Sequence, residues 1–189
     1  RDCLNSILDK TRGVTFEIFV IDNASRDDSV KIVLDAFKGV KLIVNTVNRG
    51  FAAANNQGIA LATSPYIVLL NPDTRLVEDS FSKMAAFMNS IPACGICGCR
   101  LLNSDLTLQD SVRRFPTLLD QLMILLKLHH LFPANWVLRR YLQKDFDYTK
   151  SQSVDQVMGA CFMVRNTVFK QVGPLDEELL ERLKPHIVP

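Results

Sequence analysis

Short apolar runs alternate with stretches of helical spacing along the first hundred residues of the chain. Most of the apolar runs are rich in β-branched and aromatic side chains, and we predict strands at residues 16–21, 40–44, 66–70 and 94–102. Apolar residues that recur at helical spacing predict helices at residues 29–37, 51–62 and 76–89. This alternation is typical of βαβ units, so we expect a doubly wound α/β fold with a mostly parallel sheet flanked by helices.

The regular alternation stops after residue 102 and returns near residue 154. Residues 155–164 again form a strand-like segment, and residues from about 113 to 150 are predicted to be a helical insertion. We therefore expect one incomplete domain over residues 1–189. The most apolar part of the insertion, residues 118–128, is too short to cross a bilayer as a helix.

The apolar helix of the insertion has two interpretations. Such helices most often bury one face against their own domain, and we favour that interpretation. In the alternative, the helix and its cationic and aromatic neighbours rest on an anionic membrane surface as a peripheral association. These neighbours are Lys127, His129, His130, Trp136, Arg139, Arg140 and Tyr141.

Both ends of the chain resemble interrupted elements. Residues 1–8 have the pattern of the middle of an amphipathic helix. Its apolar face would consist of Cys3, Leu4, Ile7 and Leu8. Residues 179–189 trail away after a helix-like patch without a further strand, so we expect a fragment of a longer protein.

Charge and sequence composition exclude several classes of function. The net charge is only +2 and the basic runs are limited to Arg113-Arg114 and Arg139-Arg140, so we expect no nucleic-acid partner. The chain has no secretory leader pattern and no apolar stretch of about eighteen residues, which predicts a cytoplasmic protein. Five cysteines, an odd number, favour reduced thiols over a disulfide framework.

Three of these cysteines have a spacing that suits a zinc site. Cys94, Cys97 and Cys99 could bind zinc together with His129 or His130. No second cysteine pair accompanies them, so we favour a strand whose small residues allow close packing.

The strand at residues 66–70 runs directly into Asn71-Pro72-Asp73. Because the apolar run shows no polar alternation, we predict a strand buried on both faces that ends at Pro72. Asp73 then lies at the carboxyl end of a central strand, where open α/β sheets bind their ligands. It either holds a cation or caps the helix predicted at residues 76–89.

Two further loops are predicted to lie at the same edge of the sheet. Asp22 and Asn23 offer hydrogen-bonding groups for a base or a ribose. Arg49 offers a planar donor for a carbonyl or a phosphate, and Gly50 allows close backbone approach. Asp73 can hold Mg²⁺ or Mn²⁺, which neutralises a diphosphate with few protein ligands. Together these loops indicate a metal-dependent site for a nucleoside diphosphate.

Four motifs in this order resemble family 2 glycosyltransferases of the GT-A fold, a Rossmann-like fold that binds nucleotide-diphospho-sugars. The motifs are Val20-Ile21-Asp22-Asn23-Ala24-Ser25-Arg26-Asp27, Asn48-Arg49-Gly50-Phe51-Ala52-Ala53-Ala54-Asn55-Asn56-Gln57-Gly58, Leu69-Leu70-Asn71-Pro72-Asp73 and Gly159-Ala160-Cys161-Phe162-Met163-Val164-Arg165. They span roughly residues 1–178. The stretch Arg113-Arg114-Phe115-Pro116 is similar to the rhamnosyltransferase-like branch.

The resemblance implies a role for each matching residue. On the donor side it places Asp22 and Asn23 by the nucleoside, Arg49 and Gly50 by the base or diphosphate, and Asn55 in a supporting position. Asn71 and Asp73 stand at the family's metal motif, with Asp73 as the direct ligand because Asn71 replaces the first aspartate. Gly159 and Ala160 match the segment that lines the acceptor side.

The resemblance also implies the reaction. A sugar passes with inversion from a dTDP- or UDP-sugar, with dTDP-rhamnose suggested by the branch, to a glycan or lipid-linked acceptor at the inner face of the membrane. Such a displacement needs a carboxylate base, which contributes about 10²–10⁴ in rate. The family's acidic pair is replaced here by Arg182-Leu183-Lys184-Pro185, which leaves Glu177 and Glu178 as substitute candidates. The family's first strand would precede Arg1.

Two other functions remain open on the sequence alone. A fragment without its general base would bind a nucleotide-sugar without catalysis. A sugar nucleotidyltransferase shares the layered fold, but it needs a glycine-rich loop with an arginine after its first strand, and the chain shows none.

Overall fold

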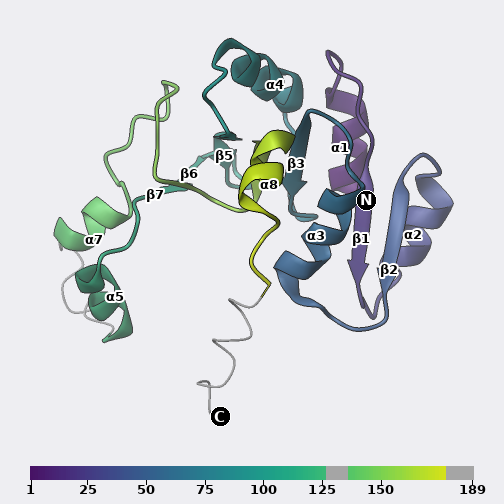
Figure 1. Cartoon of the computed structure of the whole chain (residues 1–189), viewed down its shortest axis with the longest axis horizontal. Coiled ribbons are helices and arrows are strands. Elements are labelled where there is room, and N and C mark those ends of the chain that lie inside the picture. The colour runs from purple at the N-terminus through teal and green to yellow at the C-terminus, as the bar shows by residue number, and fades with distance from the viewer. Residues whose placement is uncertain (127–135, 178–189) are drawn as a thin grey trace.

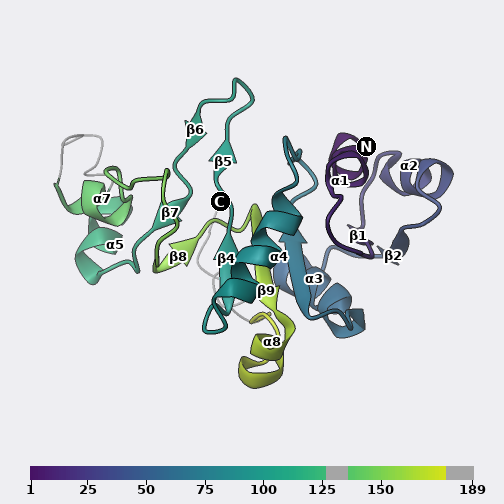
Figure 2. The ribbon, with the colours of Figure 1, turned by 90° about the horizontal axis from the view of Figure 1, so that it is seen from above.

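The computed structural model describes residues 1–126 and 136–177. The predictions for His129, His130 and Glu178 therefore lie outside the described residues. Elements α1 to α4 and β1 to β3 gather at one end of the molecule, and α5 and α7 lie at the other end in both views (Figures 1 and 2).

The first sheet consists of two parallel strands. β1 (Phe19–Asn23) pairs with β2 (Lys41–Asn45), so that Asn23 lies opposite Asn45. Helix α2 (Ser29–Ala36) joins the two strands and packs on β2, while α3 (Gly50–Leu61) packs on β1. The predicted strand–helix–strand unit is therefore confirmed, with boundaries shifted by a few residues.

The second sheet has the order β3–β9–β4. β3 (Tyr66–Leu70) and β4 (Ile96–Gly98) each pair antiparallel with β9 (Cys161–Arg165). β3 and β4 are therefore parallel to each other, and β9 is the reversed strand between them. Helix α8 (Asn166–Val172) follows β9 directly.

Two helices contribute most of the helical residues of the core cluster, which also includes Val33 of α2 and residues from strands of both sheets. These two helices are α1 (Asp2–Lys10) and α4 (Ser80–Ser90). Met88 of α4 is 0% exposed, and Met163 of β9 is 3% exposed. The predicted apolar face of α1 is confirmed except at Leu8, which is 46% exposed because the fourth inward position is taken by Ser6. Ser6 is buried because its hydroxyl accepts the backbone N–H of Leu76 at 2.9 Å.

Helix α4 begins four residues later than predicted. Asp79 is its N-cap, and one carboxylate oxygen accepts the backbone N–H of Ser82 at 3.3 Å. The other oxygen accepts the backbone N–H groups of Arg12 and Gly13, so Asp79 also fixes the segment after α1. Asp73 therefore does not cap this helix, and the capping interpretation of that residue is wrong.

Each of the two long strands predicted in the second half of the chain divides in two. The strand predicted at residues 94–102 breaks after Gly98, and β5 (Leu101–Leu102) forms a separate hairpin with β6 (Leu108–Gln109). The strand predicted at residues 155–164 divides into β8 (Gln156–Val157) and β9. β8 pairs with β7 (Val112–Arg113) instead of joining the larger sheet.

The helical insertion contains α5 (Leu118–Leu125) and α7 (Trp136–Tyr141), which contact each other. A capping box starts α5, because the Asp120 carboxylate accepts the backbone N–H and the hydroxyl of Thr117, both at 2.7 Å. Asp120 is 5% exposed, whereas Leu118 and Leu125 are 91% and 78% exposed. The interpretation that α5 buries its apolar face on the domain is therefore wrong. Among the described helices, none is long and apolar enough to cross a bilayer.

Candidate functional site

The end of β1 turns sharply after the first two predicted site residues. Ala24 has a φ of 66°, in the left-handed region, and this turn directs Ser25 back toward the strand. The Asp22 carboxylate accepts the backbone N–H of Ser25 at 3.2 Å and is only 6% exposed. Asp22 thus holds the turn. Because its side chain is buried, a ligand could contact it only through the small part that remains exposed.

Asn23 is the centre of a network of side-chain amides. Its amide nitrogen donates to the side-chain oxygen of Asn48 at 2.8 Å and to the carbonyl of Gly50 at 3.2 Å. Its amide oxygen accepts the backbone N–H of Arg49 at 2.9 Å and the side-chain amide of Asn45 at 3.3 Å. Asn23 therefore shapes the loop before α3, and its hydrogen-bonding capacity is already used within the protein.

The network extends from the loop to the body of α3. Asn45 and Gln57 exchange two hydrogen bonds of 2.9 and 3.0 Å, which tie the end of β2 to the helix. Sequence reasoning missed Asn45, Asn48 and Gln57. The signal that could have revealed Asn45 is the polar residue at the end of both parallel strands, since Asn23 and Asn45 are register partners.

The loop before α3 presents a cationic side chain at a helix N-terminus. Gly50, the first residue of α3, has a φ of 83°, a conformation that a larger residue rarely adopts. Arg49 is exposed, and within residues 1–126 and 136–177 its guanidinium has no hydrogen-bond or ion-pair partner. A free guanidinium beside the N-terminus of a helix suits an anion such as a diphosphate. Asn55 instead donates to the carbonyl of Phe51 within α3 at 2.8 Å.

The segment after β3 is a tight turn that exposes a carboxylate. The Asn71 carbonyl accepts the backbone N–H and the hydroxyl of Thr74, at 3.2 and 2.8 Å. Asp73 lies in the middle of this turn and is exposed. Its carboxylate forms no hydrogen bond or ion pair with any side chain of the described segments, so both of its oxygens are available to a cation.

The same turn is joined to the predicted acceptor-side segment. The backbone N–H of Asn71 donates to the carbonyl of Ala160 at 2.9 Å, which continues the β3–β9 pairing by one step. Gly159 is exposed, and a Cβ placed on it would meet no atom within 4 Å. The backbone at Gly159 is therefore open to a neighbouring molecule.

Glu177, one of the two candidate bases, is exposed and bound to helix α3. Its carboxylate accepts the side-chain amide of Asn56 at 2.7 Å. The side-chain amide of Asn56 also binds the backbone of Leu175 through two hydrogen bonds of 2.9 Å. Asn56, which sequence reasoning did not assign a role, thus holds the segment after α8 against α3.

The predicted site residues form two groups. Asp22, Asn23, Arg49 and Gly50 gather where β1 meets α3, and Asn71, Asp73, Gly159 and Ala160 gather where β3 meets β9. The arrows of β1 and β3 both point downward in Figure 1, so the carboxyl ends of these two strands lie on the same side of the molecule. No hydrogen bond or ion pair joins the two groups among the described residues.

The zinc alternative finds no support within the part of the chain that the structure describes. No group of three or more histidine, cysteine, aspartate or glutamate side chains there could hold a metal ion. The Cys94 and Cys97 thiols donate to backbone carbonyls of β4, at 3.3 and 3.6 Å.

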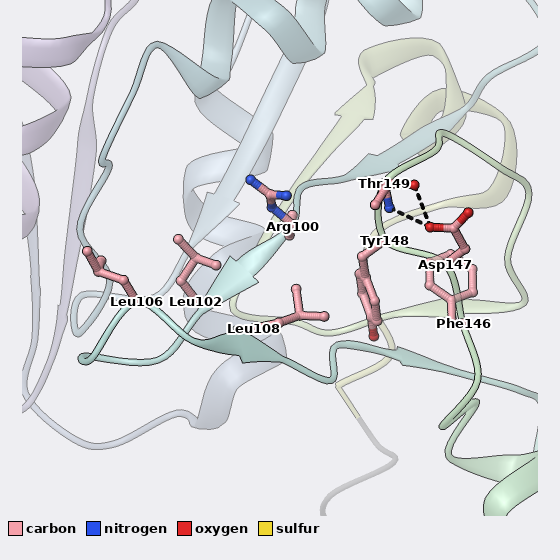
Figure 3. A pocket seen from close by; sticks show the side chains of 8 residues that line it. All are labelled: Arg100, Leu102, Leu106, Leu108, Phe146, Asp147, Tyr148 and Thr149. Atoms are coloured by element: carbon pink, nitrogen blue, oxygen red, sulfur yellow. Dashed lines mark hydrogen bonds between the residues drawn. The ribbon is translucent and has the colours of Figure 1, made fainter.

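One pocket of about 490 Å³ lies away from these loops, between the β5–β6 hairpin and the segment before β8 (Figure 3). It is lined by Arg100, Leu102, Leu106, Leu108, Phe146, Asp147, Tyr148 and Thr149. The Tyr148 hydroxyl accepts the backbone N–H groups of Ser111 and Val112, at 2.8 and 3.1 Å. Tyr148 therefore has a packing role, and none of the predicted donor residues lines this pocket.

Comparison with known proteins identifies the family. The model of glycosyl transferase family 2 matches residues 1–173. The chain belongs to glycosyl transferase family 2. The resemblance inferred from the four motifs is therefore confirmed.

Relatives of this family 2 chain include a rhamnosyltransferase. The N-acetylglucosaminyl-diphospho-decaprenol L-rhamnosyltransferase of Mycobacterium tuberculosis is 25% identical over 171 residues, which cover 85% of this chain and 55% of that protein. An uncharacterized glycosyltransferase of Haemophilus influenzae is 37% identical over 75 residues, which cover 38% of this chain and 30% of that protein.

The fold of the family 2 chain is also found in a solved structure. Residues 1–349 of S. aureus TarS in complex with UDP align with a TM-score of 0.59 and 17% identity, covering 94% of this chain and 46% of that chain. This likeness confirms the predicted α/β fold of the GT-A type. The chain spans about half the length of TarS 1–349 and of the mycobacterial relative.

Proposed function

We propose that the protein transfers a sugar from a nucleotide-diphospho-sugar to a hydroxyl group of a glycan or a lipid-linked acceptor. Membership of glycosyl transferase family 2 supports the reaction class. The observation that carries the proposal is the exposed carboxylate of Asp73, just after β3 in a turn fixed by Asn71 and Thr74, which has no hydrogen-bond or ion-pair partner within residues 1–126 and 136–177.

The donor in this proposal is a dTDP- or UDP-sugar, with L-rhamnose as the first sugar to test. The mycobacterial relative is named as an L-rhamnosyltransferase, and the structural neighbour is a complex with UDP. On the protein side, Arg49 supplies a free guanidinium for the diphosphate, beside the N-terminus of α3. Asp22, Asn23 and Asn55 have a supporting role in this proposal, because their side chains are held by hydrogen bonds within the protein.

The metal in this proposal is Mg²⁺ or Mn²⁺, held by Asp73 with Asn71 beside it. Asp73 fits such an ion, because it offers two free hard oxygen atoms on an exposed turn and these ions need few protein ligands. When bound, the ion would neutralise charge on the leaving diphosphate.

The transfer in this proposal is a single displacement with inversion. The bond from the anomeric carbon to the diphosphate breaks, a bond to the acceptor oxygen forms, and the acceptor proton passes to a carboxylate base. Gly159 and Ala160 would border the acceptor, because they lie next to the Asn71 turn. Glu177 is the one described candidate for the base, and one oxygen of its carboxylate accepts the side-chain amide of Asn56.

The helical insertion is proposed to contact a membrane that carries the acceptor. Leu118, Leu122 and Leu125 of α5 are 49% to 91% exposed, so the helix presents apolar surface outward. Arg114 and Arg140 are exposed nearby and have no acidic partner among the described residues, which suits anionic headgroups. The mycobacterial relative is named for a lipid-linked acceptor, a decaprenol diphosphate. This proposal places the protein at the cytoplasmic face of the membrane.

A transfer assay tests the proposed function. The chain is incubated with dTDP-rhamnose or UDP-sugars, Mn²⁺ and a polyprenyl-diphosphate-linked sugar, and released nucleoside diphosphate is measured. We expect release with wild type and with Asp35→Ala, an exposed carboxylate on α2, and at least a tenfold lower rate with Asp73→Ala. Donor binding without acceptor-dependent release would identify a non-catalytic nucleotide-sugar-binding protein instead.

A further inference from the structure

Two cysteines lie opposite each other at the end of the β4–β9 ladder. The antiparallel register pairs Ile96 with Val164, Cys97 with Met163 and Gly98 with Phe162. One further step places Cys99 opposite Cys161. Side chains at directly opposite positions project from the same face of a sheet. Both thiols therefore lie on the same face of the sheet, in agreement with their places in and against the core cluster.

The thiol of Cys161 interacts with Cys99 and not with the backbone. A hydrogen bond with Cys161 lowers the pKa of the Cys99 thiol, and the same contact, followed by burial, raises the pKa of Cys161. Cys99 is therefore the more easily ionised partner. Cys161 is 6% exposed, whereas Cys99 is only partly buried and can be reached by a small oxidant.

The other three cysteines have different surroundings. Cys94 and Cys97 donate to backbone carbonyls of β4, and burial raises the pKa of Cys97 to about 11. Cys3 lies 3.8 Å from the Asn71 carbonyl, and burial raises its pKa as well. Since the thiolate is the reactive form of cysteine, Cys99 is the thiol best prepared to react.

The backbone geometry at this pair permits a disulfide. The N–H of Arg165 donates to the carbonyl of Gly95, and a regular continuation of this alternation beyond Gly98 would place Cys99 and Cys161 at a position of the hydrogen-bonded type. Cα atoms of such pairs are about 5.5 Å apart. This distance lies within the range of about 4.4–6.8 Å that disulfides span. β4 ends at Gly98, so Cys99 can adjust its backbone to bring the sulfur atoms into bonding distance.

We propose that Cys99 and Cys161 are a redox-active dithiol that closes to a reversible cross-strand disulfide when a peroxide oxidises Cys99. The Cys99 thiolate attacks one oxygen of hydrogen peroxide, the O–O bond breaks, the attacked oxygen stays on sulfur as a sulfenic acid, and the other oxygen leaves as hydroxide. The Cys161 sulfur then attacks the Cys99 sulfur, and its proton leaves with the sulfenic oxygen as water. Each sulfur loses one electron overall, the peroxide gains two, and a dithiol reductant restores both thiols.

The disulfide would act on the donor loop, a consequence that rests on the proposed function. Residue Ala160, directly before Cys161, accepts the backbone N–H of Asn71 at 2.9 Å. Side chains at hydrogen-bonded positions start with Cβ atoms near 5.5 Å, and a disulfide draws them to about 3.8 Å. Closure therefore pulls the start of β9 toward β4 and away from the Asn71 turn. We expect weaker binding of a nucleoside diphosphate, by about threefold to tenfold, in the oxidised protein.

Peptide mapping tests the disulfide directly. The full chain is treated with hydrogen peroxide, its remaining thiols are alkylated, and proteolytic peptides are analysed by mass spectrometry with and without dithiothreitol. We expect a Cys99–Cys161 linked peptide that dithiothreitol removes. Cys99→Ser should abolish the link, and the matched control Cys94→Ser should retain it. Because Cys161 is buried, Cys161→Ala serves as a second variant only where its circular dichroism matches wild type.

The outcomes separate this inference from the proposed function. A link from Cys99 to Cys3 or Cys97, or irreversible sulfinic acid at Cys99 without any link, would overturn the dithiol. A disulfide with UDP and dTDP affinities equal to those of the reduced protein would overturn the coupling to the donor loop. A disulfide in a protein whose reduced form binds neither nucleotide leaves the dithiol standing and contradicts the proposed function instead.

Discussion

The side-chain oxygen of Asn23 accepts the backbone N–H of Arg49 at 2.9 Å, and this contact fixes the loop that begins α3. Asn23 is the last residue of β1 and Arg49 directly precedes α3, 26 residues apart in the sequence. Asn23 thus contributes to the site by placing Arg49 and Gly50. Its amide group has no spare hydrogen-bonding capacity for a nucleoside.

Replacing Asn23 with alanine should therefore destabilise the fold as well as weaken donor binding. Four hydrogen bonds to this amide are lost, and the backbone N–H of Arg49 loses its side-chain acceptor. We expect the free energy of unfolding to fall by about 1–3 kcal/mol, measured by urea denaturation. The control is Asn5→Ala on the exposed side of α1. Equal denaturation midpoints for the two variants would show that the network does not stabilise the loop.

Stability at low pH should depend on Asp79. Partial desolvation raises the pKa of this carboxyl. Hydrogen bonds from Ser82, Arg12 and Gly13 together lower the pKa by more than desolvation raises it, so the net pKa is lowered. A lowered pKa in the folded state means that the stabilisation is present above about pH 4 and is lost as the pH falls through the folded-state value.

We therefore expect Asp79→Asn to lower the thermal midpoint by about 2–4 °C at pH 7. The difference from wild type should shrink as the pH falls below about 4, because wild type then loses the same carboxylate. Scanning calorimetry at pH 7, 5 and 3 measures this trend. A difference that stays constant down to pH 3 would contradict the role of the ionised carboxylate.

The exposed leucines of α5 should govern binding to lipid vesicles. Leu118 and Leu125 contribute little to folding because they are 91% and 78% exposed. The double variant Leu118→Ser, Leu125→Ser should keep the thermal midpoint of wild type and should reduce cosedimentation with anionic phosphatidylglycerol vesicles at least fivefold. The matched control is Leu34→Ser on α2, where the side chain is 60% exposed. If both proteins sediment like wild type, the insertion does not contact the membrane.

The spacing of apolar residues predicted the strands and helices whose limits are set by neighbouring residues. The strand predicted at residues 66–70 coincides with β3, because a compact apolar run ends at a proline. The helix predicted from residue 76 starts at Ser80 instead, because Asp79 and not the apolar Leu76 determines where hydrogen bonding begins. Leu76 is buried all the same, by contact with α1.

Contacts between distant segments could not be predicted from one sequence. Glu177 and Asn56 are 121 residues apart, and nothing in the local pattern of either residue indicates that they meet. The outward-facing leucines of α5 were equally hidden, because amphipathic spacing shows that one face is apolar but not what covers that face. The family motifs led to the correct family. They place chemical groups at the ends of strands, and the local sequence pattern is enough to locate those strand ends.

The most direct test of the account is calorimetric titration of UDP and dTDP into the protein with and without Mn²⁺. If Asp73 holds the metal of the donor site, at least one nucleotide should bind to wild type and to Asp35→Ala in a Mn²⁺-dependent manner. In the presence of Mn²⁺, we expect the same nucleotide to bind at least tenfold more weakly to Asp73→Ala. Binding that needs no metal, or that Asp73→Ala leaves unchanged, would contradict the assignment of Asp73 as the metal ligand of the donor site.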